Sequence, residues 1–384
     1  MQLLTKTSEL AQFCRETKEF DFVTIDTEFH RETTYWPILC LIQAATSERA
    51  VLIDPMAADI DLTPFFELLD DPEIVKVFHA ARQDIEIFVH MTGKVPQSIF
   101  DTQVAASVCG HGDQISYDNL VHSIVGQRLD KSSRFTDWAA RPLSDKQKKY
   151  ALGDVTHLRD VYLALCNKLK QLDRVDWMKD ESEILERVAT YIVQPEDAWK
   201  RLKHKLSRAR DLATLKLLAQ WRETRAQKMD KPRGRILKDD AIYELAVQRP
   251  KTAGEFERLR AVPKGFGRSQ SASEIIDLIK QAENIPEADL PALPNRKRGP
   301  SPKGPVGDLL RVLLKAVSER EGVAARIIAN SDDIDALVLD DSAEIAALRG
   351  WRFKLFGEKA LAIKHGEIGL AATKDGIVEF NLSS

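Results

Sequence analysis

Two acidic residues, Asp26 and Glu28, are separated by one threonine within a run of residues typical of a β-strand. Side chains alternate between the two faces of a strand, so both carboxylates point to the same side. They repel one another unless a cation lies between them, and their apolar neighbours predict a central strand, where unpaired charge is costly. The alternative is a polar edge strand facing solvent, so the pair alone is weak evidence for a metal site.

Two further aspartates occur where the chain could bring them to the same place. Asp84 follows an apolar run at 75–78 and opens a helical pattern. Asp154 lies four residues after Tyr150, on the same face of a predicted helix. Four clustered carboxylates would form an oxygen-rich site suited to Mg²⁺ or Mn²⁺.

Tyr150 has two possible roles. A tyrosine on a helix is more often a packing residue whose hydroxyl has a partner. Its ordinary pKa of about 10 makes it a poor base at neutral pH. In a catalytic site it would therefore orient a metal-activated water molecule.

Other side chains near the acids could contact a nucleic acid. Lys131, Arg134 and Arg141 flank Trp138, and this mixture of cations and an aromatic ring could hold a phosphate backbone and stack a base. We favour substrate contact for Lys131 and Arg141, although Trp138 could equally be a core residue with solvated cations around it. His79 either contacts substrate or packs.

The elements expected to position these residues make an α/β domain of about 175 residues. Short β-prone runs at 20–29, 39–45 and 49–53 predict an antiparallel meander, and 75–78 predicts a fourth strand. Asp101 is expected to be an N-cap rather than a ligand. Apolar residues at helical spacing predict helices at 81–91, 103–109, 117–125 and 145–172, and helical patterns predominate afterwards.

Length and charge indicate more than one domain. The 384 residues exceed what one ordinary hydrophobic core organises. Residues 1–194 carry 21 basic and 31 acidic residues, 195–305 carry 25 and 15, and 306–384 carry 10 and 13, although the net charge is only −3. The acidic part could hold a metal and the basic part could face a polyanion. Ordinary variation among solvated surfaces is the alternative.

The four cysteines lie far apart in the sequence, which disfavours a zinc site and a disulfide framework. A reducing, cytoplasmic location is therefore expected. We find no signal peptide and no membrane-spanning run, so no membrane partner is expected.

The acidic residues and the short sequence motifs around them resemble the ribonuclease D family. Asp26-x-Glu28, then Asp84, then Tyr150-x-x-x-Asp154 is similar to the three motifs of DEDD exonucleases, in the variant whose third motif carries tyrosine. The resemblance covers residues 1 to about 290. It rests on short sequence motifs in the expected order: Asp26-Thr27-Glu28-Phe29, Tyr35-x-Pro37, Leu41-Ile42-Gln43, His79-Ala80, Phe100-Asp101-Thr102-Gln103, Leu129-Asp130-Lys131, Thr136-Asp137-Trp138 and Arg141-Pro142-Leu143.

This resemblance implies a ribonuclease H-like exonuclease domain with a mixed sheet that begins with three antiparallel strands. It implies that Asp26, Glu28, Asp84 and Asp154 bind two divalent cations, Mg²⁺ or Mn²⁺, and that Tyr150 positions the attacking water. The implied reaction releases nucleoside 5′-monophosphates from a free 3′ end. Transfer RNA precursors and other small structured RNAs are the implied substrates, with no obligate protein partner.

The C-terminal half resembles two HRDC domains, helical modules shared with RecQ-type helicases, of which the second is degenerate. The first contains a basic stretch expected to dock RNA, and its alternative is a solvated face. That stretch is formed by Arg222, Arg225, Lys228, Lys231 and Arg233, with Arg235 next to it. The second module is expected to dock against the other domains. The predicted bounds are 1–175 for the exonuclease domain, 176–206 for a helical connector, 207–285 for the first HRDC domain, 286–305 for a Pro-rich and basic linker, and 306–384 for the HRDC-like domain.

The sequence thus predicts a 3′-5′ exoribonuclease that matures the 3′ ends of transfer RNA precursors. Two alternatives stay open at this point. One is a DNA 3′-5′ exonuclease with the same acids, and the other is an RNA-binding protein that has kept the fold without the activity.

Overall fold

In the computed structural model, which describes residues 2–203, 206–293 and 304–382, the chain folds as two units. The first unit consists of Met1–Glu28, Leu39–Val188 and Lys297–Ser384, and the second consists of Phe29–Ile38 and Ala189–Arg296. The predicted linker at 286–305 falls largely outside the described residues, since 294–303 are not among them.

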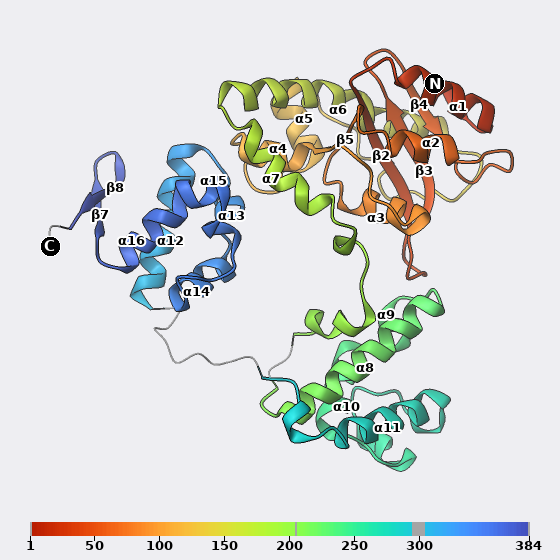
Figure 1. The fold of residues 1–384 in the computed structure, drawn as a ribbon. Coiled ribbons are helices and arrows are strands. Elements are labelled where there is room, and N and C mark those ends of the chain that lie inside the picture. Colours follow the sequence, from red (N-terminus) through yellow and green to blue (C-terminus); the bar gives the residue numbers. More distant parts are fainter. Residues whose placement is uncertain (1, 204–205, 294–303, 383–384) are drawn as a thin grey trace. The chain divides into compact units, whose positions relative to one another are not determined.

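A six-stranded mixed sheet lies at the centre of the N-terminal part of the first unit, in the order β1-β4-β3-β2-β5-β6 (Figure 1). β3 and β4 are antiparallel, whereas β1 pairs with β4, β2 with β5, and β5 with β6 in parallel. Residues 39–45 of β3 are all buried, as expected for a central strand covered on both faces. The strands are β1 (Gln2–Leu4), β2 (Phe22–His30), β3 (Ile38–Ala45), β4 (Ala50–Ile53), β5 (Val75–Phe78) and β6 (Ile99–Asp101).

Helices of this part pack against the sheet, and the longest of them, α6, is fixed at two points. Ser144 and Gln147 form a capping box at its N-terminus. Farther along, the buried Thr24 hydroxyl of β2 donates a hydrogen bond of 2.8 Å to the Val155 carbonyl. The helices are α1 (Thr7–Thr17), α2 (Thr63–Leu69), α3 (Arg82–Thr92), α4 (Thr102–Val108), α5 (Tyr117–Val125), α6 (Asp145–Gln171) and α7 (Val175–Leu185).

The predicted strands and helices of this part are present with shifted ends, and the expected mixed sheet is confirmed. One expectation is wrong: the sheet does not begin with the antiparallel strands. A short strand, β1, precedes them and pairs in parallel with β4 at the sheet edge. Three residues are too few to show strand alternation in a sequence.

The second unit is a helical bundle around one apolar core. Its core residues come mainly from α8, α10 and α11, where Leu215, Ile242 and Ile275 are fully buried. This agrees with the amphipathic spacing of the first HRDC-like segment. The elements are η1 (Val188–Thr190), η2 (Pro195–Arg201), α8 (Ala209–Lys228), α9 (Arg233–Ile236), α10 (Asp239–Gln248), η3 (Ala253–Arg258), η4 (Phe266–Arg268), α11 (Gln270–Glu283) and η5 (Glu287–Asp289).

The described C-terminal segment, 304–382, has its own apolar core and ends in a two-stranded hairpin. It contacts α7 of the same unit, where the rings of Trp177 and Trp351 stack at 4.2 Å and Arg352 pairs with Glu181. No described helix of the chain is long and apolar enough to cross a membrane. The elements are α12 (Pro305–Glu321), α13 (Ala325–Ile328), α14 (Ser331–Leu339), η6 (Ala346–Leu348), α15 (Gly350–Arg352), η7 (Phe353–Gly357), α16 (Glu358–Lys364), β7 (Ile368–Thr373) and β8 (Gly376–Asn381).

Candidate active site

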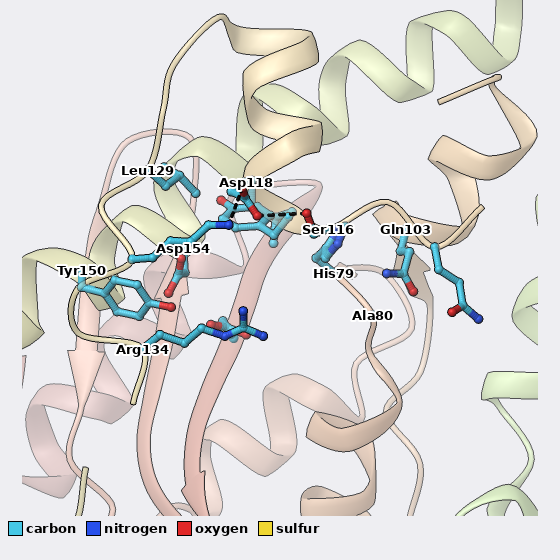
Figure 2. A pocket seen from close by; sticks show the side chains of 14 residues that line it. His79, Ala80, Gln103, Ser116, Asp118, Leu129, Arg134, Tyr150 and Asp154 are labelled. Carbon is cyan, nitrogen blue, oxygen red and sulfur yellow. Dashed lines mark hydrogen bonds and ion pairs between the residues drawn. The ribbon is translucent and has the colours of Figure 1, made fainter. Parts of the chain in front are cut away.

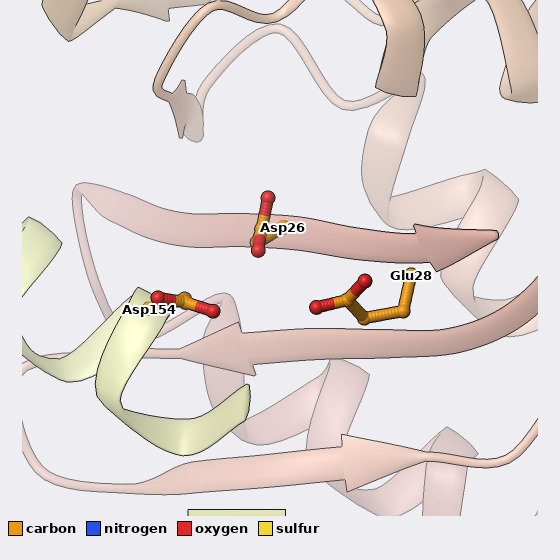
Figure 3. Close-up of side chains that lie close together, drawn as sticks. All are labelled: Asp26, Glu28 and Asp154. Atoms are coloured by element: carbon orange, nitrogen blue, oxygen red, sulfur yellow. The ribbon is translucent and has the colours of Figure 1, made fainter. Parts of the chain in front are cut away.

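Three of the four predicted acids meet where β2 passes α6. Asp26, Glu28 and Asp154 each offer a carboxylate oxygen, and these oxygens all lie within 4.8 Å of one another. Figure 3 shows the two side chains of β2 and the side chain of α6 directed toward one another. The alternation of β2 and the hydrogen bond from Thr24 to α6 produce this arrangement.

The fourth acid, Asp84, lies beside this cluster rather than within it. It stands in the first turn of α3 and is 7% exposed. The Thr27 hydroxyl, which belongs to the residue between Asp26 and Glu28, donates a hydrogen bond of 2.5 Å to Asp84 Oδ1. The carboxylate of Asp84 is not among the three whose oxygens lie within 4.8 Å of one another.

The turn that leads to Asp84 is held by Asp101. Asp101 accepts hydrogen bonds from the amides of Ala80 and Ala81, at 3.0 and 2.9 Å, and Ala80 has a positive φ of 59°. It also accepts a hydrogen bond of 2.8 Å from the Gln103 amide at the start of α4. The predicted N-cap role of Asp101 is therefore confirmed, and the same carboxylate fixes the entry into α3.

The acids are electrostatically strained without a cation. Burial raises the pKa of Asp26 to about 6, and burial together with repulsion from Asp26, Asp154 and Asp84 raises the pKa of Glu28 to about 10. For the same reasons the pKa values of Asp84 and Asp154 lie well above their ordinary range. Such a set of clustered, partly buried oxygen donors fits hard divalent cations.

Tyr150 lies one helical turn before Asp154 and lines the same cavity. Burial and the nearby charges of Asp154, Glu28 and Asp26 raise the pKa of its hydroxyl, which therefore stays protonated. On its other side the ring packs against Trp138, with 6.0 Å between ring centroids. Tyr150 can thus donate or accept a hydrogen bond in the cavity, but it cannot serve as an ionised base at neutral pH.

A cavity of about 340 Å³ opens over the acids. Figure 2 shows Tyr150, Asp154 and Arg134 at one part of it and His79 with Gln103 at another. The lining residues are Asp26, His79, Ala80, Gln103, Gln114, Ser116, Tyr117, Asp118, Leu129, Lys131, Arg134, Tyr150, Asp154 and Leu158.

Two of the four predicted substrate contacts line this cavity. His79 bonds Thr102 Oγ1 at 3.0 Å and the Ile115 carbonyl at 3.1 Å, so its ring is fixed in the wall. Lys131 forms a salt bridge of 2.6 Å with Asp118, which also lines the cavity.

The other two, Trp138 and Arg141, do not line the cavity and are held by contacts within the fold. Trp138 is 5% exposed and belongs to a core cluster, so its ring is not available to stack a base. The Arg141 guanidinium binds both carboxylate oxygens of Asp54, at 2.8 and 2.7 Å, and also the carbonyls of Cys40 and Trp138. Its donors are engaged by the fold, so these two predictions require correction: both residues serve packing and structure.

Several cavity residues were not among the predicted substrate contacts. Arg134, which flanks Trp138 in the sequence, is one of them, and its charge lowers the pKa values of Glu28, Asp154 and Tyr150. Gln103 belongs to the motif Phe100-Asp101-Thr102-Gln103, which resembles the family. The loop after α4 that supplies Gln114 and Ser116 gave no sequence signal beyond its glycines.

The predicted RNA-docking stretch is only partly on the surface of the second unit. Arg222 is 3% exposed and pairs with Asp239 at 2.7 Å, so its assignment to an exposed surface is corrected. Arg225 pairs with Glu274 at 2.8 Å and Arg233 pairs with the buried Glu223 at 2.5 Å. Lys228 and Lys231 are exposed, as are the neighbouring Arg235 and Lys238.

Comparison with known proteins assigns two of the folded segments to families. A family model of 3′-5′ exonuclease domains matches residues 1–170, and the model of the HRDC domain matches 211–279. Ribonuclease D of Nitrobacter hamburgensis is 47% identical over 383 residues, which cover 100% of both chains. Ribonuclease D of Bartonella henselae is 47% identical over 370 residues, covering 96% of this chain and 91% of that one.

A solved structure agrees with these matches. It is that of Escherichia coli RNase D, described as an exoribonuclease involved in structured RNA processing, and it has a TM-score of 0.85 at 30% identity. The similarity covers 95% of this chain and 98% of that one. The chain therefore belongs to the ribonuclease D family, with a 3′-5′ exonuclease domain followed by an HRDC domain.

Proposed function

We propose that this 3′-5′ exoribonuclease matures the 3′ ends of transfer RNA precursors and other small structured RNAs, with two divalent cations at its acidic cluster. The observation that carries the proposal is the meeting of Asp26, Glu28 and Asp154 at a cavity that Asp26 and Asp154 line together with Tyr150. The exoribonuclease activity itself follows from family membership.

Asp26, Glu28 and Asp154 would hold the cations, with Asp84 contributing its Oδ2 oxygen. When bound, the cations would activate the attacking water and offset the charge on the leaving 3′ oxygen. The carboxylates fit this role because they are half-buried and repel one another. The positive charge of Arg134 lowers the pKa values of Glu28 and Asp154, but both still lie above their ordinary range.

The chain's other residues would bind and orient the RNA end. The protonated Tyr150 hydroxyl would position the attacking water by a hydrogen bond. His79 and Lys131, which line the cavity, would contact the terminal nucleotide, and the product would be a nucleoside 5′-monophosphate.

The helical segments would bind the body of the RNA. Lys228 and Lys231, with Arg235 and Lys238, offer exposed cations on the HRDC domain that suit phosphate contacts. We keep the predicted domain bounds of 1–175, 176–206, 207–285, 286–305 and 306–384 as part of this proposal.

The last domain is proposed to be a second, degenerate HRDC domain. Both modules begin with a long helix, α8 or α12, followed by a four-residue helix and then a third helix. Each also has a glycine where a side chain would collide with a carbonyl oxygen of a preceding 3₁₀ helix. A Cβ on Gly267 would lie 2.2 Å from the Ala253 oxygen, and one on Gly357 would lie 2.4 Å from the Ala347 oxygen.

A cytoplasmic location remains part of the proposal, without an obligate protein partner. The four cysteines are free thiols, three of them buried, which suits a reducing compartment.

One assay separates the proposal from its alternatives. Purified protein in Mg²⁺ or Mn²⁺ is given a 3′-extended transfer RNA, an RNA whose 3′ end lies in a duplex stem, and single-stranded DNA. We expect stepwise shortening of the extended transfer RNA, slower attack on the stem and little on DNA. Preferred attack on DNA would favour a DNA exonuclease, and binding without shortening would favour an idle RNA-binding protein.

A further inference from the structure

Phe135 has an unusual exposure for a phenylalanine. Its side chain is 92% exposed, whereas the other exposed large hydrophobic residues of the described chain lie between 36% and 53%. Single exposed apolar residues are common on protein surfaces, and Phe135 is not among the buried core residues. Burial in the fold therefore does not explain this ring.

The loop around Phe135 is anchored on both sides. The Ser132 amide bonds Asp130 at 2.9 Å, and Ser133 is 2% exposed. After Phe135, the Thr136 hydroxyl donates a hydrogen bond of 2.8 Å to the Ser133 carbonyl and accepts one of 3.2 Å from Gln147 of α6. The fold thus holds a structured turn whose outermost side chain is an aromatic ring.

Arg134 connects this ring to the acids. The centre of its guanidinium lies 5.3 Å from the centroid of the Phe135 ring. Arg134 also lines the cavity with Asp26, Tyr150 and Asp154, whereas Phe135 does not. One residue of the pair therefore faces the reacting centre and the next one stands outside it.

This arrangement matches the repeating chemistry of a single RNA strand. A guanidinium binds phosphate oxygens, and an aromatic ring stacks on any base without regard to its identity. Trp138, the other aromatic residue of this loop region, is buried and cannot stack a base. A terminal nucleotide inside the cavity would leave the preceding base outside it, and Phe135 also stands outside it, next to Arg134.

We propose that Phe135 stacks on the base of the penultimate nucleotide of the bound RNA while Arg134 contacts the phosphate that joins it to the terminal nucleotide. The pair would hold an unpaired 3′ strand at the cavity mouth and would slow the enzyme when the strand end is in a stem. This inference rests on the proposed binding of the RNA 3′ end over the acidic cluster.

The test uses the full chain and single-stranded RNA with 2-aminopurine at the penultimate or the terminal position. With Ca²⁺ in place of Mg²⁺, wild-type protein should quench the fluorescence of the penultimate probe more strongly than the Phe135→Ala variant does. In Mg²⁺, Phe135→Ala should raise KM by about fivefold to a hundredfold, the range expected when one base loses its stacking partner, with kcat within about twofold of wild type. Phe135→Trp should restore both KM and quenching.

Phe380→Ala is the matched control, because Phe380 is 46% exposed on β8 of the C-terminal segment. If the Phe135→Ala and Phe380→Ala variants trim RNA with the same KM and quench the probe equally, the stacking role of Phe135 is wrong. If wild-type protein trims no RNA at all, it is the proposed function that fails. Arg134→Ala should raise KM as Phe135→Ala does, and an unchanged KM in Arg134→Ala would overturn the phosphate contact.

Discussion

At the scale of single residues, the acidic cluster works against the stability of the metal-free fold. Asp26 is half-buried close to two other carboxylates, and its removal from water raises its pKa. Functional sites commonly contain groups whose local repulsion is offset by a ligand. Asp26, Glu28 and Asp154 are therefore expected to support activity but to lower the stability of the metal-free fold.

Replacing one of these acids should reveal that opposition. In EDTA, Asp26→Asn should raise the midpoint of thermal unfolding by about 2–4 °C, the change that about 1 kcal/mol produces in a domain of this size. Mg²⁺ should raise the midpoint of wild type but not that of Asp26→Asn. Asp59→Asn, on an exposed aspartate of the same domain, should behave as wild type. A lower midpoint for Asp26→Asn in EDTA would show that the acid stabilises the fold.

Cation binding should depend on pH because these carboxyl groups must lose protons before they can act as ligands. The pKa of Asp26 is raised to about 6 and that of Glu28 to about 10, so both are more protonated near neutral pH than ordinary carboxyl groups. Affinity for Mn²⁺ should therefore rise with pH, by up to about tenfold per pH unit for each proton released. Titration calorimetry at pH 5.5, 6.5 and 7.5 measures this, and an affinity independent of pH would contradict it.

At the scale of elements, the loop between β2 and β3 is tied to the helical bundle within the second unit. The Tyr35 hydroxyl donates to the fully buried Glu223 of α8, and Arg233 completes the group with a bond of 2.9 Å to the same hydroxyl. Asp230 accepts hydrogen bonds from the amides of Tyr35 and Trp36, both 3.0 Å. These contacts link the loop that follows Asp26 and Glu28 in the chain to the HRDC helices.

Tyr35→Phe should loosen this link without removing the ring. The buried Glu223 loses one donor, which costs about 1–3 kcal/mol. Amide hydrogen exchange in α8 should therefore become faster by about fivefold to a hundredfold. Tyr243→Phe is the matched control, since Tyr243 is 39% exposed on α10. Equal exchange in the two variants would show that the hydroxyl does not stabilise α8.

Sequence patterns predicted those elements whose periodicity is long enough to read. β2 has nine residues and α6 has 27, and both predictions hold, as does the meeting of Asp26 and Glu28 with Asp154. The two three-residue strands, β1 and β6, carry too little alternation to be seen. Ion pairs between distant residues are also invisible in one sequence, so the pairing of Arg141 with Asp54 could not be predicted from it.

At the scale of the whole molecule, the small net charge of −3 hides two unlike parts. Some acids of the first 194 residues form the half-buried cluster of Asp26, Glu28 and Asp154. Part of the basic excess in 195–305 is used within the fold, since Arg222, Arg225 and Arg233 all have acidic partners. The cations left for RNA are therefore fewer than the sequence suggested, and Lys228 and Lys231 are foremost among them.

The double variant Lys228→Ala/Lys231→Ala tests that surface. RNA affinity should fall, and the slope of log affinity against log salt should become shallower by about 1 for each phosphate that the protein no longer neutralises. Lys315→Ala/Lys374→Ala, on exposed lysines of the C-terminal segment, serves as the control. A salt slope equal to that of wild type would return Lys228 and Lys231 to the role of solvated surface residues.

We propose that the carboxylates of Asp26, Glu28 and Asp154 make this chain a metal-dependent 3′-5′ exoribonuclease. The most direct measurement is release of nucleoside 5′-monophosphates from a 3′-extended transfer RNA by wild type and Asp154→Asn, in Mg²⁺ and in EDTA. We predict one-nucleotide trimming by wild type in Mg²⁺, with a decrease of at least about a thousandfold in EDTA or in Asp154→Asn, because both remove charge stabilisation at the reacting phosphate. Trimming by Asp154→Asn at the wild-type rate in Mg²⁺ would contradict the account.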